Sequence, residues 1–550
     1  MRIKLPKLLK AMTLMAGSFL LMHCSTPEKS HADLLLYNGT IHLMDSAMNT
    51  VPALAINKGR IAASGKRNQL EKRFEFDSVV NLEEHHLYPG FMDAHTHFYG
   101  YAAGLNRVDL RGCTSPGEVL ERLQAFDAQF NPEVIVGRGW DQSLWLGQAF
   151  PHRRMLDSLF AERPVILRRI DGHATWANSV ALKQAGIDEN TAVKGGVIAR
   201  ENGELTGILI DNAANLIEVP ELSPSQMKPL LLRAQDSLFA HGLTAVMEAG
   251  LTKNKVLQLQ KLQREGLLQL RIDALLSDND ENRDHFLGRE PIRQKRLRVQ
   301  GFKFYLDGAL GSRGALLKDG YADDPGNYGL QLSEYQHFLK HGKVLYQKGW
   351  QMAIHAIGDS ANALAARLYS EILPPENNRR WRIEHAQVVR PQTVQKMQEY
   401  AIIPSVQPTH ATSDMEWAGD RLGTAEKYAY SYRSLLHTVG HLPLGTDFPV
   451  EEIDPLKTFR AAVFRQKANG KPQGGYRKSE ALSHAEALRG MTIEAAYASF
   501  WEDEIGSLEV GKWADMVLLN KDLTKVNFEE LGQCRVLKTW IAGKEVFTRD

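Results

Sequence analysis

Cysteine is scarce in this sequence, and neither sign of charge is in excess. Three cysteines in 550 residues, at positions 24, 113 and 534, are too few for a disulfide framework or a cysteine-based zinc site. The 66 basic residues balance 65 acidic ones, which excludes the basic excess typical of nucleic-acid binding. Hydrophobic residues make up 43% and charged residues 24%, so collagen-like, disordered and coiled-coil chains are excluded as well.

Residues 1–23 are not typical of a folded domain. A basic start precedes an apolar run over 11–22, which indicates a secretory signal and is too short to span a bilayer well. Cys24 follows directly, as in bacterial lipoprotein signals whose cysteine becomes lipidated, although His23 stands where a small residue is usual. We expect an exported protein whose membrane contact is a lipid anchor at Cys24, on a bacterial periplasmic or outer surface. A plain signal peptide and an uncleaved anchor are the alternatives.

Both ends of the chain carry short β-type segments beside turns rich in asparagine and glycine. Four segments have this character: 33–39, 53–62, 514–519 and 536–543. Neither end has enough strands to close a core of its own. The sequence therefore predicts one small β-sandwich made from residues 33–86 and 501–550.

The centre, residues 87–500, alternates apolar runs with helical patterns such as 333–348 and 360–372. Eight runs are candidate strands: 87–93, 243–248, 270–276, 299–306, 351–355, 380–385, 402–407 and 442–447. Eight strands alternating with helices predict an α/β fold with a (β/α)8 TIM barrel. Residues 98–242 are too long to be a loop, so we expect an inserted subdomain after the first strand that covers the active-site end.

Metal-ligand residue types end several of these strands, where barrels of this kind build their active sites. His95 and His97 alternate along one strand, so both can face one metal ion. Four other strands end in a potential ligand: Lys303, His355, His385 and Asp447. Each alone has a commoner interpretation, such as a core histidine, a solvated lysine or a turn aspartate. Five such strand ends in one barrel indicate a single site.

The segments that carry these residues, with several others, form a recognisable set. They are Pro-Gly-Phe-Met-Asp-Ala-His-Thr-His97, Gly139-Trp-Asp-Gln142, Asp171-Gly-His-Ala-Thr-Trp-Ala-Asn-Ser179, Gly195-Gly-Val-Ile198 with Thr206-Gly207, Lys303 with Asp307-Gly308, Gly445-Thr-Asp447, and Gly506-Ser-Leu-Glu-Val-Gly-Lys-Trp-Ala-Asp515. As a set they resemble the amidohydrolase superfamily over residues 33–548. The closer resemblance is to the amidohydrolase-3 group, which includes enzymes like N-substituted formamide deformylase. Thr446 stands where this group more often has serine.

The resemblance implies two divalent metal ions per chain. One ion would be held by His95 and His97 with Asp447 as a further ligand, and the other by His355 and His385. Zinc suits imidazole and oxygen ligands, and iron and manganese are alternatives.

Lys303 would bridge the two ions as a carbamate, because an ammonium group cannot bind a cation. Burial favours the neutral amine that captures carbon dioxide. The alternative is an unmodified Lys303 paired with an acid such as Asp307 in a one-metal site. The implied reaction is hydrolysis of a non-peptide C–N bond, in an amide or N-formyl group, by metal-activated hydroxide with Asp447 as general base and then acid.

The inserted segment is expected to set specificity for a small-molecule substrate. Trp140, Asp141 and His173 lie in the part that resembles the family's substrate-facing roof, and His173 is a candidate to polarise the substrate carbonyl. His410 is a further candidate, and Arg313 could pair with a substrate carboxylate. Other hypotheses are hydrolysis of a cyclic amide, lactone or ester at the same site, decarboxylation there, or an inactive lipid-anchored binding protein. A homo-oligomer is left open.

Overall fold

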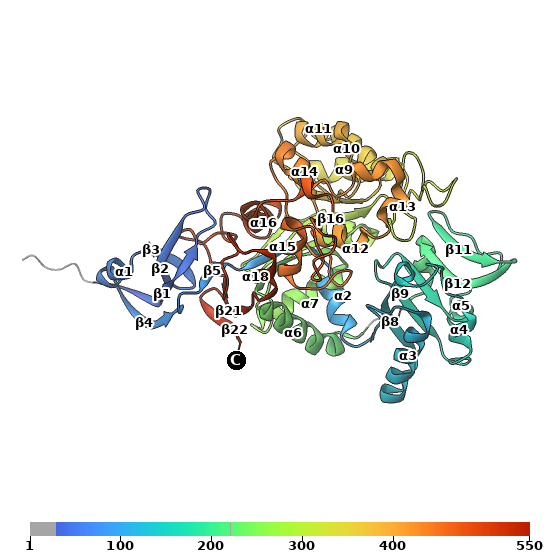
Figure 1. Cartoon of the computed structure of the whole chain (residues 1–550), viewed down its shortest axis with the longest axis horizontal. Helices are drawn as coiled ribbons and strands as arrows, with labels where there is room; N and C mark the ends of the chain where they lie inside the picture. Colours follow the sequence, from blue (N-terminus) through green and yellow to red (C-terminus); the bar gives the residue numbers. More distant parts are fainter. Residues whose placement is uncertain (1–28, 220–221, 550) are drawn as a thin grey trace, which may run out of the picture.

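The computed structural model describes residues 29–219 and 222–549 (Figure 1). The predicted signal over 1–23 and the predicted lipidation site Cys24 lie outside these residues. Across the described ranges, none of the helices combines the length and the apolar character needed to cross a membrane.

A barrel of parallel strands forms the centre of the molecule. Its sheet runs in the order β19-β18-β17-β16-β14-β13-β6. The strands are β6 (Phe91–Thr96), β13 (Leu243–Leu251), β14 (Arg271–Ser277), β16 (Leu297–Tyr305), β17 (Gln351–Ala356), β18 (Arg382–His385) and β19 (Ile403–Ser405), with the short antiparallel β15 (Ile292–Arg293) beside β16. Their side chains are buried almost throughout, as is typical of parallel strands covered on both faces. The predicted α/β barrel is confirmed.

The eighth predicted strand closes the barrel without forming a regular ladder. Residues 442–447 make a single parallel bridge to Val406. The amide of Gly445 donates to the carbonyl of Val406 (3.0 Å), and the amide of Asp447 donates to the carbonyl of His95 (2.8 Å). A Cβ atom on Gly445 would lie 2.6 Å from the amide nitrogen of His95, so this close approach requires glycine.

Helices on the outside of the barrel follow most of its strands. The principal ones are α6 (Pro224–Ala240), α7 (Lys253–Arg264), α9 (Tyr335–Lys348), α10 (Asp359–Ser370) and α11 (Pro391–Glu399). The side chain of Ser223 accepts from the amide of Gln226 and caps α6, and α9 ends at Gly349 in the left-handed conformation. α9 and α10 correspond to the predicted helical segments 333–348 and 360–372.

The predicted first barrel strand, 87–93, is wrong in its bounds. Its first half belongs to β5 (His86–Pro89), which pairs with β1 (Ser30–His42) and β20 (Met516–Leu519). The chain passes into the barrel strand β6 at Gly90, whose amide donates to the carbonyl of Asp515 (2.8 Å). One apolar run therefore supplies strands to two sheets.

Strands from both ends of the chain form one eight-stranded sheet. Its order is β22-β21-β20-β5-β1-β2-β3, with β4 paired to β1. The remaining strands are β2 (Thr50–Asn57), β3 (Arg60–Gly65), β4 (Phe74–Asn81), β21 (Val536–Ile541) and β22 (Lys544–Thr548). The division of this unit into two packed layers stays a prediction.

A third sheet lies within the segment predicted as an insertion. It runs β11-β12-β10-β9-β8-β7. Its strands are β7 (Val108–Asp109), β8 (Ile135–Trp140), β9 (Val165–Arg169), β10 (Ala174–Ala177), β11 (Gly196–Glu201) and β12 (Glu204–Asp211), and α3 (Pro116–Phe130) packs beside them. Because α2 (Phe98–Gly104) and α6 pack in the barrel core, the inserted unit contains fewer residues than the predicted range 98–242.

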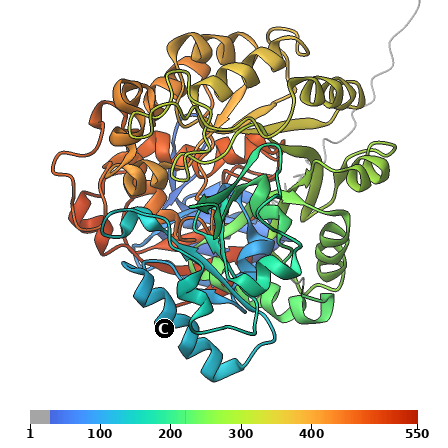
Figure 2. The same cartoon turned by 90° about the vertical axis from the view of Figure 1, so that its right-hand side faces the viewer.

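The inserted sheet and the terminal sheet lie at opposite ends of the molecule, with the barrel between them (Figure 1). Figure 2, which faces the inserted unit, shows it in front of the barrel. Cys113 packs in the core of the inserted unit and Cys534 in the main core, and both are free thiols.

Candidate metal centre and active site

A cavity of about 890 Å³ lies between the barrel and the inserted sheet. Five of the six predicted metal ligands line it: His97, Lys303, His355, His385 and Asp447. The sixth, His95, is fully buried beside them. The opposite wall comes from the inserted unit, through Asp141, Arg169, Asp171, His173 and Asp211.

The potential ligand atoms lie close together around Asp447. Its Oδ1 atom is 3.2 Å from Nε2 of His97 and 3.7 Å from Nε2 of His95. One ligand atom each of His95, His385 and Asp447 lies within 4.8 Å of the others. The rings of His355 and His385 are 4.5 Å apart between centroids, so the fourth histidine joins the same group. The structure therefore brings the predicted residues into one cluster.

The donor set fits divalent cations. Among the described residues, Nε2 of His355, Nε2 of His410 and Oδ1 of Asp447 are buried without a hydrogen-bond partner. An unpaired buried polar group costs about 1–3 kcal/mol, so three of them in one cavity indicate that something else pairs with them. Burial lowers the pKa values of His95, His355 and His385 well below the usual range, which keeps these imidazoles neutral and able to bind a metal.

Asp447 is ionised and held in an unusual backbone conformation. Burial opposes its charge, but the imidazole of His97, 3.2 Å from Oδ1, outweighs this and lowers the pKa of Asp447. Its φ is 63° and that of His385 is 75°, a region that non-glycine residues seldom adopt. Strain of this kind, about 1–3 kcal/mol per residue, persists where the surrounding structure aims a functional side chain.

Lys303 lies at the centre of the cluster. Its Nζ atom is 3.4 Å from Nε2 of His95, and burial lowers its pKa to about 8. The alternative pairing with Asp307 is not found. The carboxylate of Asp307 instead accepts the backbone amides of Leu316, Ile357 and Gly358. A buried lysine whose ammonium is destabilised is suited to carbamate formation.

Two carboxylates hold β6, the strand with His95, in place. Asp93 accepts the amides of His95 (3.1 Å) and Thr446 (3.0 Å) and the hydroxyl of Thr446 (2.6 Å), which joins β6 to the segment carrying Asp447. Glu384 lies 2.5 Å from Nδ1 of His95 and accepts from Arg382 through its other oxygen (2.6 Å). With Nδ1 of His95 bonded in this way, its Nε2 atom faces the cluster.

Replacing Glu384 by glutamine is expected to weaken metal binding about 10–100-fold, as for other partners that orient metal-bound histidines. Glutamine keeps the shape but no longer fixes the tautomer of His95. Competition for zinc against a chromophoric chelator measures the change. Glu452→Gln, an exposed glutamate paired with Lys457, is the matched control. Equal zinc affinity in Glu384→Gln and the control would show that Glu384 does not orient the ligand.

Three of the predicted substrate contacts lie at the cavity. The Nδ1 atom of His173 is 2.7 Å from Oδ1 of Asp211, and its ring is 5.1 Å from that of His355. Burial opposes its protonation, but the hydrogen bond and charge of Asp211 outweigh it and raise the pKa of His173. Nε2 of His410 lies 3.8 Å from Oδ2 of Asp447, and Asp141 lines the wall where it pairs with Arg169.

The other two predicted contacts are wrong. Trp140 is fully buried in the core of the inserted sheet, and its indole N–H donates to the carbonyl of Leu167 (2.9 Å). Arg313 pairs with Asp323 at 2.8 Å and does not line the cavity. Trp140 belongs to the motif Gly139-Trp-Asp-Gln142 and Arg313 follows the motif that ends at Gly308, but the side chains of both turn away from the cavity.

The inserted unit supplies cavity cations that sequence analysis missed. Arg107 and Arg138 line the cavity, and Arg168 lies near them. Arg138 donates to the carbonyl of Ile170 (3.1 Å), while its Nε atom is buried without a partner in the described ranges. Burial and the charge of Arg138 lower the pKa values of Arg107 and Arg168. Scattered arginines carry no sequence signal that they will meet in space.

Most of the chain is similar to known sequences and to a solved structure. The sequence profile of the amidohydrolase family matches residues 78–547 of this chain. Protein LONG AFTER FAR-RED 3 of Arabidopsis thaliana is 34% identical, over 94% of this chain and 92% of its own. N-substituted formamide deformylase of Arthrobacter pascens is 27% identical, over 93% and 97%. The crystal structure of an uncharacterized metal-dependent hydrolase from Pyrococcus horikoshii superimposes with a TM-score of 0.74 at 29% identity, covering 90% of this chain and 99% of that one.

Proposed function

Because the chain belongs to the amidohydrolase family, we propose that it is a metal-dependent hydrolase that cleaves a non-peptide C–N bond, in an amide or N-formyl group. The observation that carries the proposal is the convergence of His95, His97, His355, His385 and Asp447 around Lys303, with buried donor atoms left unpartnered toward one cavity. A binding protein without chemistry has no need for such a donor set.

Each residue of the cluster has a defined task in this proposal. The four histidines with Asp447 and a carbamylated Lys303 would hold two divalent ions, which supply a water acidified toward neutral pH and polarise the substrate carbonyl. The ionised carboxylate of Asp447 would accept a proton from the attacking water. It then delivers the proton to the leaving nitrogen, so that one group acts as base and then as acid.

Groups on the cavity wall would orient the substrate. The imidazolium form of His173, favoured by Asp211, can donate a hydrogen bond to the carbonyl oxygen and stabilise negative charge as it develops. His410 lies beside Asp447 with its Nε2 atom unpartnered among described residues, within reach of the same centre. The inserted unit lies in front of the barrel (Figure 2), where it would limit the access of bulk water to the cavity.

The likeness to N-substituted formamide deformylase supports the choice of bond. Arg107 and Arg138 line the cavity, where they could pair with a carboxylate group of a substrate. The substrates to test therefore include N-formyl and N-acyl compounds with and without a carboxylate group.

A screen of such compounds with zinc-loaded enzyme is expected to give release of formate or carboxylate and of the amine. Activity should disappear in His97→Asn, which removes one ligand at the cavity rim. A surface variant, His31→Gln, is the control. Hydrolysis of lactones or esters without hydrolysis of any amide or N-formyl compound would contradict the proposal that the enzyme cleaves a C–N bond. Normal turnover by His97→Asn would contradict the site itself.

A further inference from the structure

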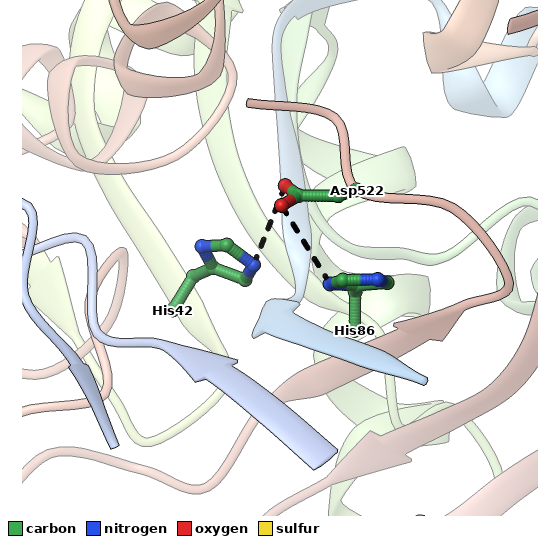
Figure 3. A group of neighbouring side chains, drawn as sticks. All are labelled: His42, His86 and Asp522. Carbon is green, nitrogen blue, oxygen red and sulfur yellow. Dashed lines mark ion pairs between the residues drawn. The ribbon is translucent and has the colours of Figure 1, made fainter. Parts of the chain in front are cut away.

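A second cluster of ligand-type side chains lies far from the cavity, in the sheet built from both termini. His42 ends β1, His86 begins β5, and Asp522 follows β20. Figure 3 shows both imidazoles directed at the carboxylate of Asp522. Nε2 of His42 lies 3.6 Å from Oδ1 of Asp522, and Nδ1 of His86 lies 4.0 Å from Oδ2.

These separations are too long for hydrogen bonds, so the two imidazole nitrogens are unsatisfied. Nε2 of His42 and Nδ1 of His86 are buried and have no hydrogen-bond partner within 29–219 or 222–549. The side chain of His42 is only 7% exposed, so solvent does not readily reach it. Buried nitrogens aimed at a common point indicate a missing partner between them.

Hydrogen bonds hold one oxygen of the Asp522 carboxylate, and among the described residues the other oxygen accepts none. Its Oδ1 atom accepts from the hydroxyl of Tyr88 (3.1 Å) and from the amide (3.0 Å) and hydroxyl (2.6 Å) of Thr524. Oδ2 has only a 3.6 Å approach from Lys525, whose side chain is 82% exposed. The ring of His42 stacks on that of Tyr88 at 4.2 Å, which fixes its orientation.

The charge states suit a cation. Burial lowers the pKa of His42 to about 4, and it also lowers the pKa of His86, so both imidazoles have a free lone pair at neutral pH. Burial works against the charge of Asp522, but hydrogen bonds from Thr524 and Tyr88 lower its pKa to about 2. The group therefore presents two neutral nitrogens and one anionic oxygen.

We propose that His42, His86 and Asp522 form an additional divalent-metal site of the zinc type, separate from the active site. Ligand atoms around tetrahedral zinc are separated by about 3.3 Å. One ligand atom of each of the three residues already lies within 4.8 Å of the others, so small side-chain movements would bring them to a common ion. Water would take the fourth position. The site would join β1 and β5 to the segment after β20 and so link the two ends of the chain.

An exposed group of the same residue types offers a matched control. In His31, Asp33 and Asp77 the imidazole Nε2 atom already makes a 2.9 Å hydrogen bond to Asp77. The side chains of His31 and Asp77 are 60% and 65% exposed. This is an ordinary surface pair, and we assign it no metal.

The test is the number of zinc ions retained per full-length chain after dialysis against micromolar Zn²⁺, measured by elemental analysis. His42→Gln and His86→Gln should each retain one zinc ion fewer than the wild type, while His31→Gln should retain the wild-type number. The test compares the zinc content of each variant with that of the wild type, so it is valid whether or not the active site also holds zinc.

Folding is checked by circular dichroism on the same samples. If His42→Gln unfolds because the stacking of His42 on Tyr88 is lost, the zinc content of His86→Gln tests the proposal. The side chain of His86 is 21% exposed and therefore easier to replace. Wild-type zinc content in the folded His86→Gln variant would overturn the proposal. A loss of one zinc ion from His31→Gln as well would also overturn it, because the binding would then be unspecific surface binding.

Discussion

Asp447→Asn enzyme is expected to turn over substrate about 10²–10⁴-fold more slowly than the wild type, the range that proton transfer by a positioned group contributes. Asparagine has nearly the same shape and keeps one carbonyl oxygen, but it cannot accept the proton of water or return it to the leaving nitrogen. The buried, ionised carboxylate beside His97 has both abilities. Steady-state kinetics with the substrate found in the screen measures the loss.

Metal content separates the two roles assigned to Asp447. If Asp447→Asn retains its metal and loses kcat, the proton-transfer role accounts for the effect. If metal is lost as well, the carboxylate acts first as a ligand. Asp323→Asn is the control, because Asp323 pairs with Arg313 and Arg421 away from the cavity lining. Turnover by Asp447→Asn within threefold of the control would contradict both roles.

Replacing Lys303 by methionine should abolish measurable turnover and lower the metal content by at least one ion per chain. Methionine has a similar length but offers no anion to bridge two cations. Without that anion, the mutual repulsion of two ions near His95 and His385 is not offset. Elemental analysis and kinetics on the same preparation measure both effects.

The carbamate itself has a direct signature. Wild-type enzyme equilibrated with 13C-labelled bicarbonate should give a carbamate carbon resonance that Lys303→Met lacks. Lys303→Glu places a permanent carboxylate near the same point and should retain more metal than Lys303→Met. Equal metal content in all three proteins, with no resonance in the wild type, would show that Lys303 is an unmodified lysine.

Much of the barrel could be predicted because its strands are continuous apolar runs between amphipathic helices. The candidate strands 243–248 and 351–355 fall on β13 and β17, and parallel strands carry their final residues to one rim. The ligand positions follow from that register alone. His355 and His385 needed no knowledge of loops to be placed together.

Predictions failed where tertiary contacts determine the bounds of a strand or the direction of a side chain. The Pro89-Gly90 pair within 86–96 is a break signal that the predicted strand 87–93 passes over, and the chain leaves one sheet and enters another at this point. Trp140 lies in one motif and Arg313 shortly after another, and only the packing of the inserted sheet and the position of Asp323 show that they turn away from the cavity.

Other features bring together residues that are remote in the sequence. The arginines of the cavity wall and the cluster of His42, His86 and Asp522 depend on contacts between distant segments of the chain, which periodicity cannot predict. The export signal and the lipid anchor at Cys24 stay predictions from the sequence.

The most direct measurement is anomalous scattering at the zinc absorption edge from crystals of the zinc-loaded enzyme. Two peaks are expected in the cavity, each in contact with histidine side chains from the set His95, His97, His355 and His385, with Asp447 at one of them and density for a carbamate on Lys303 between them. Side chains pointing apart, with no anomalous peak among them, would contradict the account.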